Sequence, residues 1–303
     1  DKACHNLWIH DGSKDLTVDR YLYRSLLKDS LDKIFATKCP NVKDAVECKL
    51  FGTGLESFTV GSHEFYMGYA VKNGIMATLD MGHFHPTEET YDKISAMLLF
   101  TPEILLHVSR PVRWDSDHVV ILNDSVQMLA QEIVWADALN KVNIGLDYFD
   151  ASINRIGAYV IGSRATQKAF LQALLSPIKQ LRDYESSGRF FQRLALLEES
   201  KSMPWAAVYD YFCYKNNVPV AEDYITEIEK YEKEITAKQK AYKKKQKKLH
   251  IKQLKHSIKW VKSDMDRSGF TNQFHITYKN VSGKTIKKVE FYFRLGSGRT
   301  CTA

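Results

Sequence analysis

The chain has 303 residues, of which 44% are hydrophobic and 26% charged, a composition typical of folded globular proteins. It contains no apolar run long enough to form a transmembrane helix, and its first residues lack the apolar core of a signal peptide. The five cysteines are scattered and include no C-x-x-C pair, which argues against a disulfide framework and against a zinc finger, and predicts a reducing, cytoplasmic location.

The net charge of +7 is unevenly distributed along the chain. Residues 1–237 hold 25 Lys and Arg against 33 Asp and Glu, whereas residues 238–303 hold 18 against 3. The chain therefore reads as an acidic body of charge −8 joined to a basic tail of charge +15.

Short apolar segments alternate with amphipathic helical patterns through the first part of the chain. The predicted strands are 6–9, 44–51, 75–80, 104–109 and 142–148. The helical patterns that follow them lie near 17–36, 61–72, 88–100, 124–139 and 151–175. This order indicates βα units around a buried parallel sheet.

The repeat of about 30–40 residues favours an α/β fold of the (β/α)8 TIM barrel type, of which about five strands can be counted. A doubly wound sheet is the alternative, but it would prefer a Gly-rich phosphate fingerprint after an early strand. Gly52-Thr-Gly54 is a weak match to that fingerprint and is interpreted as a loop.

The second part of the chain changes character twice. Residues 177–237 show helical periodicity, and the Lys-rich run 238–248 predicts a solvated helix extension or a linker. Alternation in 274–280 and 286–293, around a turn at 280–284, predicts a β-hairpin. We therefore expect a partial barrel at 1–176, a helical extension at 177–238 and a basic, β-rich tail at 239–303.

Four residues whose side chains commonly bind metals lie at or near the ends of consecutive predicted strands: Glu47, Asp80, His107 and Asp147. They are separated by 33, 27 and 40 residues, one βα unit each. A barrel gathers such strand-end side chains at one face. Carboxylates mixed with imidazoles suit Mn²⁺, Zn²⁺ or Mg²⁺ better than a thiolate-seeking metal.

A second group of candidate ligands follows these strands. His83 comes three residues after Asp80, and Asp115 and Asp117 would face the same way in an extended segment. Taken singly, each residue could be a surface carboxylate or a structural histidine. The recurrence of seven such residues across four βα units favours a two-metal site, with His85 and His118 in supporting or structural roles.

Five segments that contain these residues closely resemble L-rhamnose isomerase. They are DAVECKLFG (44–52), GSHEFYMGY (61–69), LDMGHFHPTE (79–88), LHVSRPVRWDSDHVV (106–120) and IGLDYFDASIN (144–154). The resemblance runs over about residues 1–238 and corresponds to the C-terminal part of that family's barrel with its C-terminal helices.

The resemblance implies an intramolecular oxidoreductase that interconverts L-rhamnose and L-rhamnulose as a homotetramer with Mn²⁺, for which Zn²⁺, Co²⁺ or Mg²⁺ could substitute. It places one ion on Glu47, Asp80, His107 and Asp147. It places a second, catalytic ion on His83, Asp115 and Asp117. The implied mechanism is a hydride shift between C1 and C2, with an ene-diol route as the alternative.

The same resemblance implies roles for two residues outside the metal ligands. Lys49 corresponds to a lysine that contacts the substrate and takes part in catalysis, and Trp8 to an aromatic wall of the sugar pocket. With about five of eight strands, the chain is expected to hold the ligand set in an incomplete pocket, as an inactive fragment would.

Two other functions fit parts of the sequence. A non-enzymatic fusion or interaction protein could bind acidic partners through the basic tail. Its aromatic residues Tyr242, Trp260 and Phe270 are not regularly interleaved with lysines, which argues against nucleic-acid recognition. A metal-dependent hydrolase or nuclease on a similar barrel is the other alternative, and the long motif match argues against it.

Overall fold

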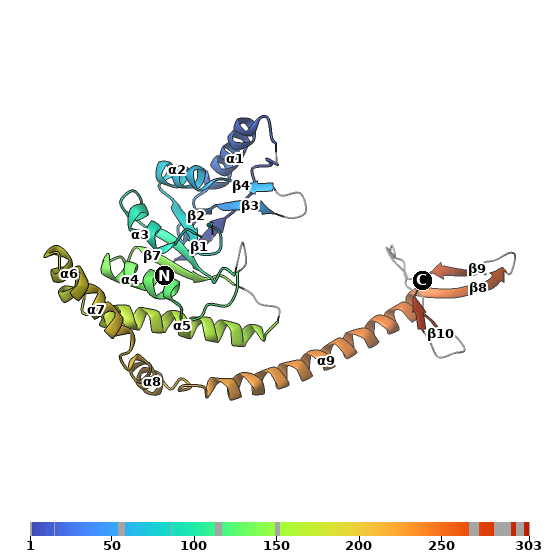
Figure 1. The fold of residues 1–303 in the computed structure, drawn as a ribbon. Helices are drawn as coiled ribbons and strands as arrows, with labels where there is room; N and C mark the ends of the chain where they lie inside the picture. The colour runs from blue at the N-terminus through green and yellow to red at the C-terminus, as the bar shows by residue number, and fades with distance from the viewer. Residues whose placement is uncertain are drawn as a thin grey trace. The chain divides into compact units, whose positions relative to one another are not determined.

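The computed structural model describes the chain except residues 1, 15, 54–57, 86, 113–116, 149–151, 267–272, 282–291, 295–299 and 303. It divides into two compact units, Asp1–Ile225 and Thr226–Ala303. The first unit contains a curled, five-stranded parallel sheet flanked by helices (Figure 1).

The strands of this sheet are β1 (Ala3–Leu7), β2 (Val42–Glu47), β5 (Met76–Asp80), β6 (Ile104–Val108) and β7 (Val142–Leu146), and they lie side by side in chain order. All four pairings are parallel. A doubly wound sheet would reverse its strand order at a switch point, and these five strands show no reversal. The α/β prediction is confirmed, with the five described strands forming a half-barrel.

Four of the five described helices that follow strands begin at a residue whose side chain caps the helix. The helices are α1 (Arg20–Phe35), α2 (His63–Asn73), α3 (Tyr91–Leu98), α4 (Asp124–Trp135) and α5 (Arg155–Leu175), and α3 is the exception. Asn123 accepts a hydrogen bond from Val126 N, and Asn154 accepts one from Gly157 N. Gly74 ends α2 in the left-handed region at φ 60°, where glycine is unstrained.

The two faces of the sheet have different side chains because successive residues of a strand point to opposite sides. Outward-facing residues such as Val46, Leu79 and Leu106 join the large core shared with the helices. Inward-facing Ala45 and Met76, with Leu105, form a small separate cluster. Each of these apolar side chains stabilises the fold by about 1.5–3 kcal/mol when fully buried, less for alanine.

The predicted strand 44–51 is wrong in one respect, because it is two strands. The parallel strand β2 ends at Glu47, and β3 (Lys49–Thr53) begins an antiparallel hairpin with β4 (Phe58–Val60). Cys48 lies between the two strands, so Glu47 and Lys49 do not share one strand face. Gly52 and Thr53, predicted as loop, belong to β3.

At the N-terminal end of the sheet, polar residues of β2 and β7 meet Glu103, which directly precedes β6. Asn143 Nδ2 donates to Glu103 Oε2 at 3.0 Å, and Lys43 Nζ contacts the same carboxylate oxygen. These hydrogen bonds from Asn143 and Lys43 lower the pKa of Glu103 below its usual value. The Glu103 carboxylate therefore stabilises this end of the sheet when it is ionised.

Helices α6 (Ile178–Ser186), α7 (Phe190–Lys201) and α8 (Trp205–Lys215) complete the first unit, in the predicted helical region. Buried Arg164 links α5 to the segment that follows α8, because its guanidinium donates to Pro219 O and Ala221 O, each at 3.1 Å. The same guanidinium lies about 5 Å from the ring centroids of Tyr209 and Tyr224.

The second unit contains most of helix α9 (Tyr224–Ser257), which runs through the Lys-rich segment. Strands β8 (Ile258–Asp266) and β9 (Gln273–Asn280) pair antiparallel, and β10 (Tyr292–Arg294) pairs with β11 (Thr300–Thr302). Residues 274–280 thus form a strand as predicted, but their described partner is β8. The predicted turn and most of the predicted strand 286–293 lie outside the described residues. Over the described residues no helix is long and apolar enough to cross a membrane.

Candidate metal centre

Acidic and imidazole side chains meet at the C-terminal ends of the parallel strands. Glu47 is the last residue of β2 and Asp80 the last of β5, while His107 lies near the end of β6 and Asp147 directly follows β7. Glu47, Asp80 and His107 are each two or four residues beyond an inward-facing apolar residue, so they also face inward. The strand pattern therefore brings together side chains that are up to 100 residues apart in sequence.

The imidazole of His107 is the meeting point of three carboxylates. Its Nδ1 lies 3.4 Å from Glu47 Oε1, 3.4 Å from Asp80 Oδ2 and 3.1 Å from Asp147 Oδ2. Glu47 and Asp80 are each 1% exposed, whereas the side chain of Asp147 is 57% exposed. The four predicted ligands of the first ion thus lie together, with Asp147 on the solvent side.

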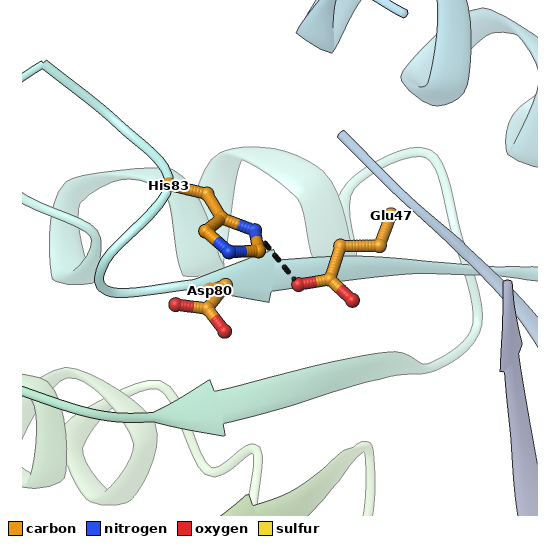
Figure 2. Close-up of side chains that lie close together, drawn as sticks. All are labelled: Glu47, Asp80 and His83. Atoms are coloured by element: carbon orange, nitrogen blue, oxygen red, sulfur yellow. Dashed lines mark ion pairs between the residues drawn. The ribbon is translucent and has the colours of Figure 1, made fainter. Parts of the chain in front are cut away.

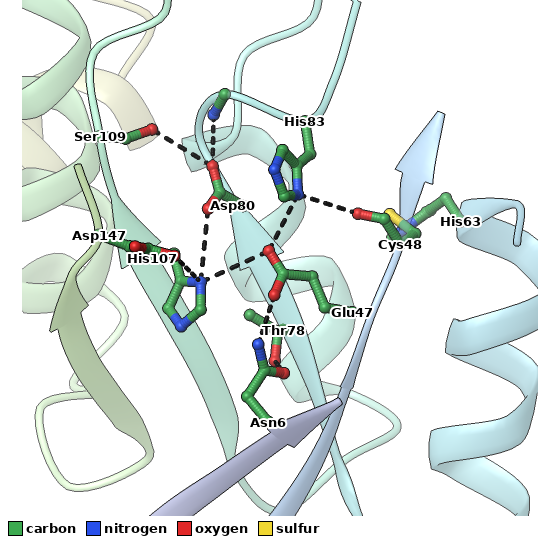
Figure 3. Close-up of polar contacts among 11 residues, drawn as sticks. Asn6, Glu47, Cys48, His63, Thr78, Asp80, His83, His107, Ser109 and Asp147 are labelled. Carbon is green, nitrogen blue, oxygen red and sulfur yellow. Dashed lines mark hydrogen bonds and ion pairs between the residues drawn. The ribbon is translucent and has the colours of Figure 1, made fainter. Parts of the chain in front are cut away.

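His83 joins this cluster from the turn that follows β5. Its Nδ1 lies 2.9 Å from Glu47 Oε1 (Figure 2) and 3.2 Å from Cys48 O (Figure 3). His83 was predicted to belong to a second group with Asp115 and Asp117, and in the structure it also adjoins Glu47 and Asp80 of the first group. The two groups are therefore contiguous.

Asp117 lies close to the same turn. A Cβ atom on Gly82 would be 2.6 Å from Asp117 Oδ1 and 3.2 Å from Asp80 Oδ1, so only glycine allows both carboxylates this approach. The backbones of Arg110 and His118 pair at 3.1 Å in both directions and fix the ends of the connecting loop. Asp115 lies in that loop, outside the described residues.

The charges of the cluster shift its proton equilibria strongly. Burial opposes ionisation of Glu47, but the imidazoles of His107 and His83 outweigh it and lower the pKa of Glu47 to about 2. Burial likewise lowers the pKa of each imidazole, but the surrounding carboxylates raise the pKa of His83 to about 9 and that of His107 to about 12. These shifts favour protonated imidazoles beside an ionised Glu47, so binding of a cation to the same nitrogens would displace protons.

The donor set fits a divalent cation. Glu47 Oε1, Asp80 Oδ2 and His107 Nδ1 are buried and form no hydrogen bond with the described residues, although they lie at ion-pair distances. One ligand atom from each of Glu47, Asp80 and His83 lies within 4.8 Å of the others, and so do atoms of Asp80, His107 and Asp147. Buried polar atoms without hydrogen bonds that converge in this way are typical of a cation site.

The two residues predicted to contact substrate lie near each other beside the cluster. Lys49 begins β3, and its Nζ lies 5.6 Å from the ring centroid of Trp8. Trp8 follows β1 and is 49% exposed, so its ring offers an apolar surface to solvent. Their contact with a sugar stays a prediction.

Sequence reasoning missed the neutral groups that hold the carboxylates. Asp80 Oδ1 accepts hydrogen bonds from Gly82 N at 2.6 Å and Ser109 Oγ at 3.2 Å. Glu47 Oε2 accepts from Asn6 Nδ2, and Thr78 Oγ1 donates to Asn6 Oδ1 at 2.7 Å. The sequence did contain one indication of the role of Thr78. It lies two residues before Asp80 and therefore shares the inward strand face of that residue.

A curled parallel sheet with a carboxylate and histidine cluster at the C-terminal strand ends defines an α/β protein with a half-barrel and a candidate metal centre. The family model described as L-rhamnose isomerase (RhaA) matches residues 1–239. The chain belongs to the L-rhamnose isomerase family, which confirms the resemblance seen in its motifs.

Individual relatives agree with this assignment. The L-rhamnose isomerase of Bacteroides thetaiotaomicron is 65% identical over 230 residues, which are 76% of this chain and 55% of that protein. Those of Escherichia coli and Mannheimia succiniciproducens are 55% and 56% identical over 225 residues, 74% of this chain and 54% of each relative. The chain spans about half the length of the curated relatives it matches.

Proposed function

We propose that this chain carries the two-metal centre of an L-rhamnose isomerase and interconverts L-rhamnose and L-rhamnulose. The observation that carries the proposal is the convergence of Glu47, Asp80, His83, His107 and Asp147 at the C-terminal strand ends of a chain from this family. Mn²⁺ is the ion we propose, and Zn²⁺, Co²⁺ or Mg²⁺ could occupy the same oxygen and nitrogen ligands.

Each side chain has a proposed role. Glu47, Asp80, His107 and Asp147 hold a substrate-binding ion, and His83, Asp115 and Asp117 hold a catalytic ion. Lys49 donates to sugar oxygens, and Trp8 packs against the apolar side of the sugar. Bound divalent cations would supply Lewis acidity and a water of lowered pKa.

The proposed reaction transfers a hydride from C2 of the open-chain aldose to C1, while the proton of the O2 hydroxyl moves to O1. An ene-diol route would instead remove the C2 hydrogen as a proton. L-rhamnose deuterated at C2 separates the two routes, because a hydride shift keeps the deuterium at C1 and an ene-diol exchanges it with water. Loss of the deuterium to solvent would contradict the hydride shift.

Metal-dependent activity of the purified full chain tests the function. L-rhamnulose formation should stop with EDTA, return with Mn²⁺ and be abolished by Asp80→Asn. Asp44→Asn is the matched control, because Asp44 lies on β2 away from the cluster and pairs with His5 and Lys38. Absence of Mn²⁺-dependent L-rhamnulose, or equal loss in both variants, would contradict the proposal.

Location and assembly extend the proposal. The cysteines Cys4, Cys39, Cys48 and Cys213 are free, which supports a reducing cytoplasm. An apolar groove of about 580 Å³ between α5 and α8, lined by Phe170, Val208 and Phe212 among others, supports burial in an oligomer, the tetramer proposed for the intact family.

The basic segment supports a second candidate function. Every lysine from Lys238 to Lys248 is exposed on α9, so the helix presents positive charge to acidic partners. We propose residues 239–303 as a separate region on this basis, after a barrel part at 1–176 and a helical extension at 177–238. Retention of the chain on heparin that falls steeply with salt would support this function, and salt-independent absence of binding would contradict it.

A further inference from the structure

The two oxygens of the Glu47 carboxylate have different surroundings. Oε1 faces the imidazoles, 2.9 Å from His83 Nδ1 and 3.4 Å from His107 Nδ1. Oε2 faces away from them and accepts a hydrogen bond from Asn6 Nδ2 (Figure 3). Only Oε1 is therefore directed into the cluster.

The chemistry of the three groups fixes the direction of this hydrogen-bond chain. A carboxylate that ligates a cation is ionised and can only accept, so the Asn6 atom beside it must be the donor Nδ2. The other amide atom is then Oδ1, an acceptor. The Thr78 hydroxyl, 2.7 Å from Oδ1, must therefore donate to it, which locks the amide of Asn6 against rotation.

The chain of hydrogen bonds crosses three neighbouring strands. Asn6 lies on β1, Glu47 on β2 and Thr78 on β5, and Glu47 and Thr78 are paired in the sheet register. Thr78 is 2% exposed and Glu47 is 1% exposed. Because all three side chains start from paired strands, their relative positions are set by the sheet rather than by loops.

We infer that Asn6 and Thr78 are positioning residues that hold Glu47 Oε2 so that Oε1 is presented to the metal. The inference rests on the proposed function, because it assumes that Glu47 is a ligand. Neither residue belongs to the proposed metal ligands or to the proposed substrate contacts. Each acts through the carboxylate, as outer groups that orient metal ligands do.

Asp80 is held in the same manner by different groups. Its Oδ1 accepts from Gly82 N and Ser109 Oγ, which leaves Oδ2 directed at His107 Nδ1, 3.4 Å away. Two neighbouring carboxylates therefore each have one oxygen bonded to neutral donors and one directed into the cluster. This repetition supports a positioning role rather than a chance contact of Asn6.

Titration of the full chain with Mn²⁺ alone, followed by the electron paramagnetic resonance signal of free Mn²⁺, tests the inference. Asn6→Ala and Thr78→Val should each raise the Mn²⁺ dissociation constant about 10-fold or more. Thr78→Ser keeps the hydroxyl and should bind within about twofold of the unsubstituted chain.

Asn143→Ala is the matched control. Asn143 is a partly buried asparagine of the same sheet that also donates to a glutamate, Glu103, but at the opposite strand ends. It should lower the melting temperature and leave the Mn²⁺ dissociation constant within about twofold.

The outcomes separate this inference from the proposed function. Tight Mn²⁺ binding in Thr78→Val, or an equal loss in Asn6→Ala and Asn143→Ala, would overturn the positioning role alone. A failure of the unsubstituted chain to bind Mn²⁺ would overturn the proposed metal centre and the inference with it. If Asn6→Ala does not fold, the Thr78→Val and Thr78→Ser pair still decides the question.

Discussion

Helix α5 approaches the end of β7 so closely that Gly162 has no room for a side chain. A Cβ atom at this position would lie 1.8 Å from Tyr148 Oη and 2.4 Å from Tyr148 Cζ, where ordinary contacts begin at 3.4 Å. Gly162→Ala must therefore displace the buried tyrosine ring by about 1.6 Å or move the helix. Because Tyr148 directly follows Asp147, the displacement begins next to a proposed metal ligand.

Three contributions determine the expected change in the free energy of unfolding. Alanine in a helix is favoured over glycine by about 0.5–1 kcal/mol. Overpacking costs about 1–3 kcal/mol, and loss of the hydrogen bond from Tyr148 Oη to Ala158 O, 3.2 Å long, costs about 1 kcal/mol more. Gly162→Ala should therefore destabilise the first unit by about 1–3 kcal/mol.

Urea denaturation of Gly162→Ala and Gly68→Ala provides the comparison. Gly68 lies in α2, and a Cβ atom there would meet nothing within 4 Å, so Gly68→Ala should stabilise by about 0.5–1 kcal/mol. Both substitutions replace glycine by alanine within a helix, so both gain the same stability from helix propensity. Any difference between their free energies of unfolding therefore comes from packing. Equal stabilisation by both would refute the close approach of α5 to Tyr148.

Two further substitutions probe charge and buried hydrogen bonding. Because the pKa of Glu103 is lowered on folding, its stabilisation is complete above the unfolded pKa of 4.5 and is lost as the pH falls through the lower folded value. Glu103→Gln should lower the free energy of unfolding by less than about 1 kcal/mol at pH 7, since the side chain is partly exposed. Below about pH 5 the urea midpoint of this variant should fall less than that of the exposed control Glu185→Gln. An equal fall in both variants would contradict the prediction. Arg164→Lys should cost about 2–3 kcal/mol, because one ammonium cannot replace the fork that binds two carbonyls, while exposed Arg182→Lys should change stability by less than about 0.5 kcal/mol. Equal melting temperatures for the two Arg variants would show that the buried guanidinium contributes little.

The order of the strands and the faces of their residues could be predicted from the sequence. Strand periodicity is local and exact, so the positions of Glu47, Asp80 and His107 relative to inward-facing residues follow from counting. Helix starts at Asn123 and Asn154 have equally local causes in side-chain capping.

The turns could not be predicted in the same way. The boundary between β2 and β3 at Cys48 and the contact between His83 and Glu47 depend on turn and loop conformations. The periodicity of the sequence does not describe these conformations. The hydrogen bonds from Asn6 and Ser109 depend on which strands are neighbours and on their register. These are long-range properties that become definite only when the sheet has assembled.

The alternation of sheet faces makes the metal centre sensitive to errors of assembly. A slip of one residue in β5 would turn Asp80 toward the helices and bring Leu79 into the interior, and the same slip in β6 would bury His107 in the apolar core. A cation that needs ligands from several strands binds only the sheet in which every strand is aligned. Its binding free energy therefore stabilises the native sheet relative to each slipped alternative. Bound metal would thus select the correct strand alignment during folding, in addition to any role in a reaction.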